Sequence, residues 1–143
     1  MHVSAIWRSV LLTIESTMIP ERVIMSAEQW TPFIAQTNGR MAALRKAMPD
    51  TAKAFGALAQ AATADGALDP KAKELIATAI GITARCDGCI GFHVKAAIRH
   101  GASRQELVET IAMAVYMGGG PSMIYGAEAL AAYDELVEAL QPA

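Results

Sequence analysis

Charged side chains are scarce in this sequence. Asp, Glu, Lys and Arg make up 18% of its 143 residues, whereas apolar residues make up 53%. Typical soluble domains carry about 25% charged residues. This composition excludes an intrinsically disordered chain, and one small domain cannot bury so much apolar surface. We therefore expect one domain whose copies cover one another in a homo-oligomer.

Concentrated positive charge is missing as well. The net charge is −2, and no basic cluster is longer than the pair Arg45 and Lys46. Binding to nucleic acid depends on a basic face that displaces counterions from the phosphates. The sequence therefore argues against a nucleic-acid partner.

Long apolar runs are also absent. No uninterrupted run reaches the ~18 residues that a membrane-spanning helix requires. The closest approach, residues 111–127, is broken by three glycines and Pro121. The N-terminal stretch has a short apolar run, but no convincing signal-peptide cleavage site follows it. We expect a cytoplasmic protein without membrane contact. The first two dozen residues are not expected to take part in the chemistry, and translation of the natural protein could alternatively begin at Met25.

Strand-forming patterns do not occur, because β-branched and aromatic residues never alternate with polar ones along a run. Alanine, the best helix former, occurs 29 times. We therefore predict an all-α, single-domain bundle of about six helices, with residues 39–143 as the core. Residues 1–38 form an N-terminal segment, partly helical or loosely attached. The predicted helices span residues 39–47, 49–64, 70–84, 87–100, 103–117 and 122–140.

Several helix ends have clear local signals. Asp69 followed by Pro70 is typical of an N-cap and a first helical position. Ser103 and Glu106 have the spacing of a capping box, in which each side chain accepts from the other residue's backbone N–H. Gly101 has the position of a residue that ends a helix in the left-handed conformation.

The only two cysteines, Cys86 and Cys89, lie close together, and His93 follows one turn later. On a helix, where each residue advances by about 100°, these three side chains fall within about 60° of one another. The helix N-terminus beside Cys86 favours a negatively charged thiolate. His93 is then suitably spaced to accept or relay a proton from sulfur.

These residues allow more than one interpretation. A Cys-x-x-Cys pair at a helix start can form a redox-active disulfide, although the absence of strands excludes a thioredoxin fold. The cysteines could instead be small buried apolar residues, or a structural disulfide of a secreted domain. With His93 they could hold zinc at an open site, but His2 and His100 are poorly placed to complete a structural zinc site. From the residues alone these alternatives stay open.

A wider pattern, Glu74-x11-Cys86-x2-Cys89-x3-His93, lies within "LDPKAKELIATAIGITARCDGCIGFHVKAAIRHGAS", and "MGGGPS" follows in the glycine-rich break. With these motifs, residues 41–140 resemble the alkylhydroperoxidase D-like branch of the carboxymuconolactone decarboxylase superfamily. The resemblance implies an all-helical fold and assembly as a homotrimer or homohexamer. It also implies a thiol-dependent peroxidase or disulfide oxidoreductase that reduces hydroperoxides in antioxidant defence.

The resemblance also implies a role for each residue of the pattern. Cys89 would attack the peroxide and become a sulfenic acid, and Cys86 would resolve it in a Cys86–Cys89 disulfide. Glu74 and His93 would form the proton relay. No bound cofactor or metal is implied; the reductant would be an external dithiol on a lipoyl or thioredoxin-like protein. Asp87 and Gly88 depart from the family pattern, which has a histidine between the cysteines, so the preferred peroxide and reductant stay open.

Two alternative functions are a carboxymuconolactone decarboxylase-like enzyme and a metal-binding helical module without redox turnover. The decarboxylases generally lack the cysteine pair. We further expect Tyr116 and Tyr125 to line a pocket over the cysteines, and His100 to interact with free carbonyls at a helix end. The methionines, among them Met113 and Met117, are expected to fill gaps in the core and in subunit interfaces.

Overall fold

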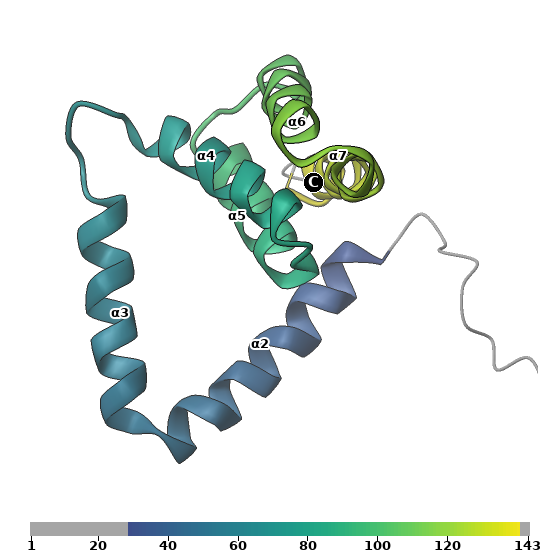
Figure 1. The fold of residues 1–143 in the computed structure, drawn as a ribbon. Helices are drawn as coiled ribbons and strands as arrows, with labels where there is room; N and C mark the ends of the chain where they lie inside the picture. Colours follow the sequence, from purple (N-terminus) through teal and green to yellow (C-terminus); the bar gives the residue numbers. More distant parts are fainter. Residues whose placement is uncertain (1–28, 141–143) are drawn as a thin grey trace, which may run out of the picture.

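The computed structural model describes residues 29–140, which form six α-helices and no strand (Figure 1). The helices are α2 (Trp30–Ala47), α3 (Pro49–Thr63), α4 (Pro70–Thr83), α5 (Asp87–Arg99), α6 (Arg104–Gly118) and α7 (Gly120–Leu140). The all-α prediction is confirmed. Within this range no helix is both long and apolar enough to cross a membrane. The predictions about residues 1–28, including His2 and a start at Met25, lie outside the described residues.

The core is made by α4, α5, α6 and α7, which Figure 1 shows gathered on one side of the molecule. Its largest fully buried side chains include Ile82, Ile90, Leu107 and Leu136, one from each helix. Burying such a side chain stabilises the fold by about 1.5–3 kcal/mol. Buried apolar side chains of these four helices therefore meet in one cluster.

The helix α2 begins at Trp30, nine residues before the predicted start at Gly39, so the expected division after residue 38 falls inside a helix. Its first turns pack on α5, where an added Cβ at Gly91 would lie 3.1 Å from both Trp30 and Ile34. The carboxylate of Glu135 on α7 accepts from the N–H groups at the start of the helix. These tertiary contacts outweigh the weak helix propensity around Gly39.

Together α2 and α3 form an arm that leads away from the core and returns at α4 (Figure 1). Trp30 and Ile34 are the buried residues of α2, and α3 has none. The bend between the two helices is at Met48 and Pro49, where proline starts α3 as its first residue.

The predicted break at residues 118–121 is shorter than expected. Only Gly119 is outside a helix, with φ +70°, a value that favours glycine. Gly120 and Pro121 already belong to the first turn of α7. Proline is tolerated there because the first N–H groups of a helix have no intrahelical partner.

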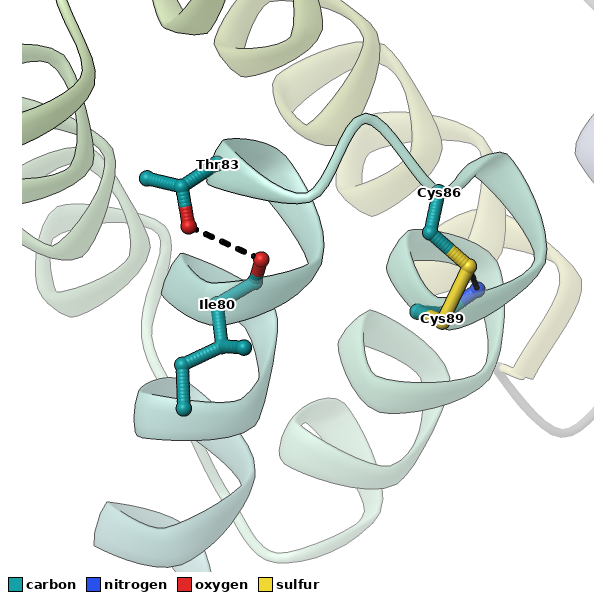
Figure 2. The surroundings of a disulfide bond; sticks show 4 residues. All are labelled: Ile80, Thr83, Cys86 and Cys89. Atoms are coloured by element: carbon teal, nitrogen blue, oxygen red, sulfur yellow. Dashed lines mark hydrogen bonds between the residues drawn. A yellow bond between two sulfur atoms is a disulfide. The ribbon is translucent and has the colours of Figure 1, made fainter.

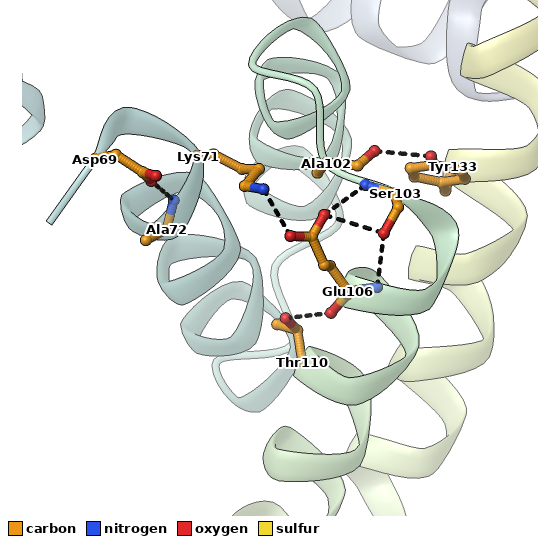
Figure 3. A network of polar contacts seen from close by, with 8 residues as sticks. All are labelled: Asp69, Lys71, Ala72, Ala102, Ser103, Glu106, Thr110 and Tyr133. Carbon is orange, nitrogen blue, oxygen red and sulfur yellow. Dashed lines mark hydrogen bonds and ion pairs between the residues drawn. The ribbon is translucent and has the colours of Figure 1, made fainter.

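The predicted caps are present. Asp69 accepts from the N–H of Ala72 at 2.7 Å, and Ser103 and Glu106 form both bonds of the capping box. Glu106 also pairs with Lys71 of α4 at 2.6 Å, so the cap joins two helices (Figure 3). The hydrogen bond from Lys71, followed by those from Ser103, lowers the pKa of Glu106 to about 2.

Candidate active site

The site is built at the junction where α4 ends and α5 begins (Figure 2). The N–H of Cys86 donates to Gly81 at 3.0 Å and that of Arg85 to Ile82 at 3.1 Å, the two bonds of a Schellman motif. Arg85 occupies the left-handed position with φ 57°, where glycine is usual. This tight ending of α4 sets the position of Cys86 as the N-cap of α5.

The two cysteines are joined by a disulfide, and their Cα atoms lie 5.2 Å apart. The sulfur of Cys86 also accepts from the N–H of Cys89 at 3.2 Å, so it caps the helix as an Asp or Ser side chain would. Both residues are partly exposed. The predicted helix start at residue 86 or 87 is confirmed, with Cys86 just outside the helix proper.

Gly81 allows α4 and α5 to approach closely beside the disulfide. A Cβ added to Gly81 would lie 3.2 Å from the Cβ of Cys89 and 3.4 Å from the backbone nitrogen of Ile90. The same residue supplies the carbonyl that accepts from the N–H of Cys86. Gly81 therefore contacts both halves of the cysteine pair.

The structure brings Glu74 of α4 against His93 of α5. The Oε2 atom of Glu74 lies 2.7 Å from Nδ1 of His93. Glu74 is buried, whereas 36% of the His93 side chain is exposed. The expected contact across these two helices is present, and the imidazole is the part of the pair that solvent and small reactants can reach.

The contact has a consequence for the proton of the imidazole. An ionised carboxylate only accepts hydrogen bonds, so Nδ1 of His93 carries the proton when Glu74 is ionised. In the neutral imidazole the other ring nitrogen, Nε2, then has no proton and can act as a base. A histidine held in this way by a carboxylate is the usual arrangement of a proton relay.

A cavity of about 360 Å³ is lined by the start of α2, by α7 and by the first residue of α5. Its lining residues are Gln29, Trp30, Phe33, Asp87, Ile124, Tyr125 and Glu128. Tyr125 lines this cavity, but Glu74, His93 and both cysteines do not. Tyr116 is 79% exposed on α6 and is not part of the lining. The expectation that both tyrosines line a pocket over the cysteines stays a prediction.

Other residues singled out in the sequence have simpler surroundings. His100 is the C-cap of α5, and its backbone N–H donates to the carbonyls of Ala96 and Ala97. Met113 and Met117 are 59% and 74% exposed, so within one copy they do not fill the core. Among residues 29–140 no group of three His, Cys, Asp or Glu residues is arranged to hold a metal ion.

Sequence reasoning missed the residues that position the cysteines. Gly81 lies in the last turn of α4, still inside the helix, where glycine is unfavourable, and this was a usable signal of close packing. Arg85 gave no such signal, because nothing in its residue type indicates a left-handed conformation. The anchor at Glu135 was also invisible, since its partners lie more than 100 positions away in the chain.

Comparison with known proteins shows which family has this sequence and fold. The family model described as the carboxymuconolactone decarboxylase family matches residues 49–132, more than half of the chain. An uncharacterized protein from Cupriavidus necator is 42% identical over 103 residues, 72% of this chain and 91% of that protein. Another, from Haemophilus influenzae, is 35% identical over 104 residues, 73% of this chain and 92% of that protein.

Two solved structures are also similar. A carboxymuconolactone decarboxylase family protein from Legionella pneumophila is 50% identical with a TM-score of 0.73, covering 75% of this chain and 96% of that one. A family protein from Thermotoga maritima, with a suggested part in an antioxidative response, is 28% identical with a TM-score of 0.67. It covers 73% of this chain and 90% of that one. The chain therefore belongs to the carboxymuconolactone decarboxylase family.

Proposed function

We propose that this protein is a thiol-dependent peroxidase in which Cys89 reduces a hydroperoxide and Cys86 resolves the product. The observation that carries the proposal is the contact between Glu74 and His93, at 2.7 Å, on the two helices that also hold the Cys86–Cys89 disulfide. A buried carboxylate, a reachable imidazole and a disulfide at a helix start are the parts that thiol redox chemistry needs.

The reaction divides into three balanced steps. The thiolate of Cys89 attacks the peroxide oxygen, the O–O bond breaks, and sulfenic acid and alkoxide form; the alkoxide then takes a proton and leaves as alcohol. The thiol of Cys86 attacks this sulfenic acid, which releases water and closes the disulfide. An external dithiol reduces the disulfide to two thiols and is itself oxidised to a disulfide.

In this scheme the Glu74–His93 pair acts in the first step. His93 takes the proton of the Cys89 thiol through its free Nε2, and the Glu74 carboxylate stabilises the resulting imidazolium. The positive charge of the imidazolium then lies beside the negative charge of Glu74, where α4 and α5 meet. The proton is available again for the leaving alkoxide.

Two further observations support a redox role over the alternatives. The cysteines are paired with each other in the described structure, which is the oxidised end state of the proposed cycle. The Thermotoga maritima relative has a suggested part in an antioxidative response. We infer a dithiol protein as the electron donor and the cytoplasm as the place where such a donor is available.

The test is a thiol titration of the reduced protein before and after one equivalent of hydroperoxide, followed by mass mapping. We expect the loss of two thiols per chain and a peptide pair linked through Cys86 and Cys89. Cys86→Ser should stop at a sulfenic acid on Cys89, whereas Cys89→Ser should abolish peroxide consumption. Unchanged peroxide consumption by Cys89→Ser would disprove the proposal.

A further inference from the structure

The cavity where α2 meets α5 and α7 has no part in the proposed reaction, yet it has the features of a ligand site. Its volume of about 360 Å³ lies within the range of about 300–1,000 Å³ that is usual for small-molecule sites. Neither cysteine, and neither residue of the Glu74–His93 pair, belongs to its lining. The cavity is therefore a candidate for a second binding site on this chain.

Three aromatic side chains line the cavity. Trp30 and Phe33 come from α2, and Tyr125 comes from α7. The rings of Trp30 and Phe33 meet edge to face, with their centroids 5.8 Å apart. The face of an aromatic ring carries negative partial charge, so it attracts an organic cation as well as an apolar group. This wall therefore suits an apolar body, with or without a positive charge.

Two carboxylates decide between these possibilities. Asp87 of α5 and Glu128 of α7 line the same cavity, whereas no lysine, arginine or histidine does. Among residues 29–140 neither of these carboxylates forms a salt bridge. An ammonium group placed between aromatic rings and carboxylates is attracted by both. The lining therefore favours a positively charged ligand over a neutral one.

An anionic ligand is disfavoured, although two helices begin at the cavity. The N–H groups at the start of α2 could bind an anion, but the carboxylate of Glu135 already accepts from them at 2.7–2.8 Å. Asp87 is the first residue of α5, where its negative charge already faces the positive end of the helix dipole. Both helix starts are thus supplied with negative charge by the chain itself.

The aromatic wall is held in place by contacts outside the cavity. Trp30 packs on α5, where a Cβ added to Gly91 would lie 3.1 Å from the indole ring. Glu135 holds the backbone at the start of the same helix. A wall that is fixed before the ligand arrives loses little conformational entropy on binding.

We propose that this cavity binds a small organic cation, an ammonium group carried on an aromatic body. The aromatic body packs against Trp30, Phe33 and Tyr125, and the ammonium faces Asp87 and Glu128. A lysine side chain of another protein has only a flexible alkyl stem, which covers less of these rings. The inference does not depend on the proposed peroxidase activity, because binding is measured without peroxide.

Saturation-transfer NMR titrations of the full-length, oxidised protein at neutral pH test the chemical class of the ligand. The probes are 2-phenylethylammonium, the neutral 2-phenylethanol, the anionic 3-phenylpropanoate, and n-butylammonium as a mimic of lysine. We expect 2-phenylethylammonium to bind about 10-fold more tightly than each of the others. A Kd above about 10 mM for this probe, equal affinity for the alcohol, or tighter binding of the anion or of n-butylammonium would each overturn the proposal.

Removal of one carboxylate tests the location of the site. Glu128→Gln keeps the size of the side chain but removes its charge, so it should weaken binding of 2-phenylethylammonium about 5-fold and leave binding of 2-phenylethanol unchanged. Glu138→Gln makes the same change on α7 outside the lining and is the matched control. Equal affinities of the two variants for 2-phenylethylammonium would show that the cation does not bind in this cavity.

Discussion

A buried carboxylate is unfavourable unless a partner satisfies it, and in this protein the partner of Glu74 is the imidazole of His93. At the residue scale this pair is the clearest sign of chemistry. Most helical glutamates are solvated at the surface, whereas Glu74 is buried on a helix that packs against the one holding Cys89. The pair fixes one ring nitrogen of His93 and leaves the other available.

This arrangement makes Glu74→Gln informative. The amide keeps the size of the side chain but cannot balance the positive charge that His93 gains when it takes the thiol proton. We expect kcat/KM for peroxide to fall about 100-fold, a usual magnitude for loss of acid–base assistance. The rate is measured by peroxide consumption with a dithiol donor, and the exposed Glu109→Gln on α6 is the control. Equal rates in both variants would remove Glu74 from the relay.

Gly81 leads to a prediction about the disulfide. In Gly81→Ala the added Cβ would meet the Cβ of Cys89 at 3.2 Å, so α4 and α5 must separate by a few tenths of an ångström. The cross-linked pair adapts less easily than two free thiols. We therefore expect the reduction potential to become less negative, by about 30 mV.

The potential in this experiment is measured by equilibration with glutathione. Gly88→Ala is the matched control, because it lies in the same motif and its added Cβ would meet nothing within 4 Å. A shift in the control that equals the shift in Gly81→Ala would show that the close approach is not its cause.

At the scale of the elements, α2 is held by one carboxylate at its start. Glu135 of α7 accepts from the N–H groups of Gln29, Trp30 and Thr31 at 2.7–2.8 Å. Burial raises the pKa of Glu135, but these donors lower it by more, so its pKa lies below the ordinary value. The carboxylate also faces the positive end of the α2 dipole.

We expect Glu135→Ala to lower the free energy of unfolding by about 1–3 kcal/mol, because three N–H donors lose a charged acceptor. The measurement is urea denaturation followed by circular dichroism. The exposed Glu138→Ala, one turn further along α7, has the same change of charge and composition. A loss of stability no greater than that of Glu138→Ala would contradict the anchoring role.

At the scale of the whole molecule, stability depends on pH through carboxylates that are paired in the folded state. The pKa of Glu106 is lowered from 4.5 to about 2, mainly by Lys71. A carboxylate whose pKa is lower in the folded than in the unfolded protein stabilises the fold at pH values above its unfolded-state pKa. This contribution is lost as the pH falls towards the folded-state pKa. We therefore expect the Tm to fall between about pH 4.5 and about pH 2.

A series of thermal melts across this range checks the expectation. In Glu106→Gln the amide has no titratable proton, so its Tm should fall less steeply over the same interval. The capping bonds that an amide oxygen can still accept are kept in this variant. Parallel curves for the wild type and Glu106→Gln would show that other groups control the acid sensitivity.

Much of the fold was predictable because its signals are local. The caps at Asp69 and Ser103, the end at Gly101 and the start of α5 beside Cys86 all depend on residues within one turn of each other. The start of α2 was misjudged, since Gly39 looks like a boundary and only contacts with α5 and α7 keep the helix continuous.

The candidate site was predictable only in part. Its four residues stand in a recognisable pattern, but the contact between Glu74 and His93 depends on how α4 and α5 pack, and Gly81 allows their close approach. Tyr125 lines a cavity that includes none of these four residues, and Tyr116 is exposed on α6. Where a side chain on α6 or α7 points relative to α5 depends on helix packing and not on its distance along the sequence.

By itself, the sequence determined the helical class, the positions of most helix ends and the proximity of the two cysteines, because each follows from interactions over a few residues. The tertiary structure decided which carboxylate meets His93, what anchors α2, and that α3 lies outside the core with none of its residues buried among the described part of the chain. Those outcomes depend on packing between segments distant in the chain, where close contacts and free energies of burial select one arrangement among many that local propensity allows.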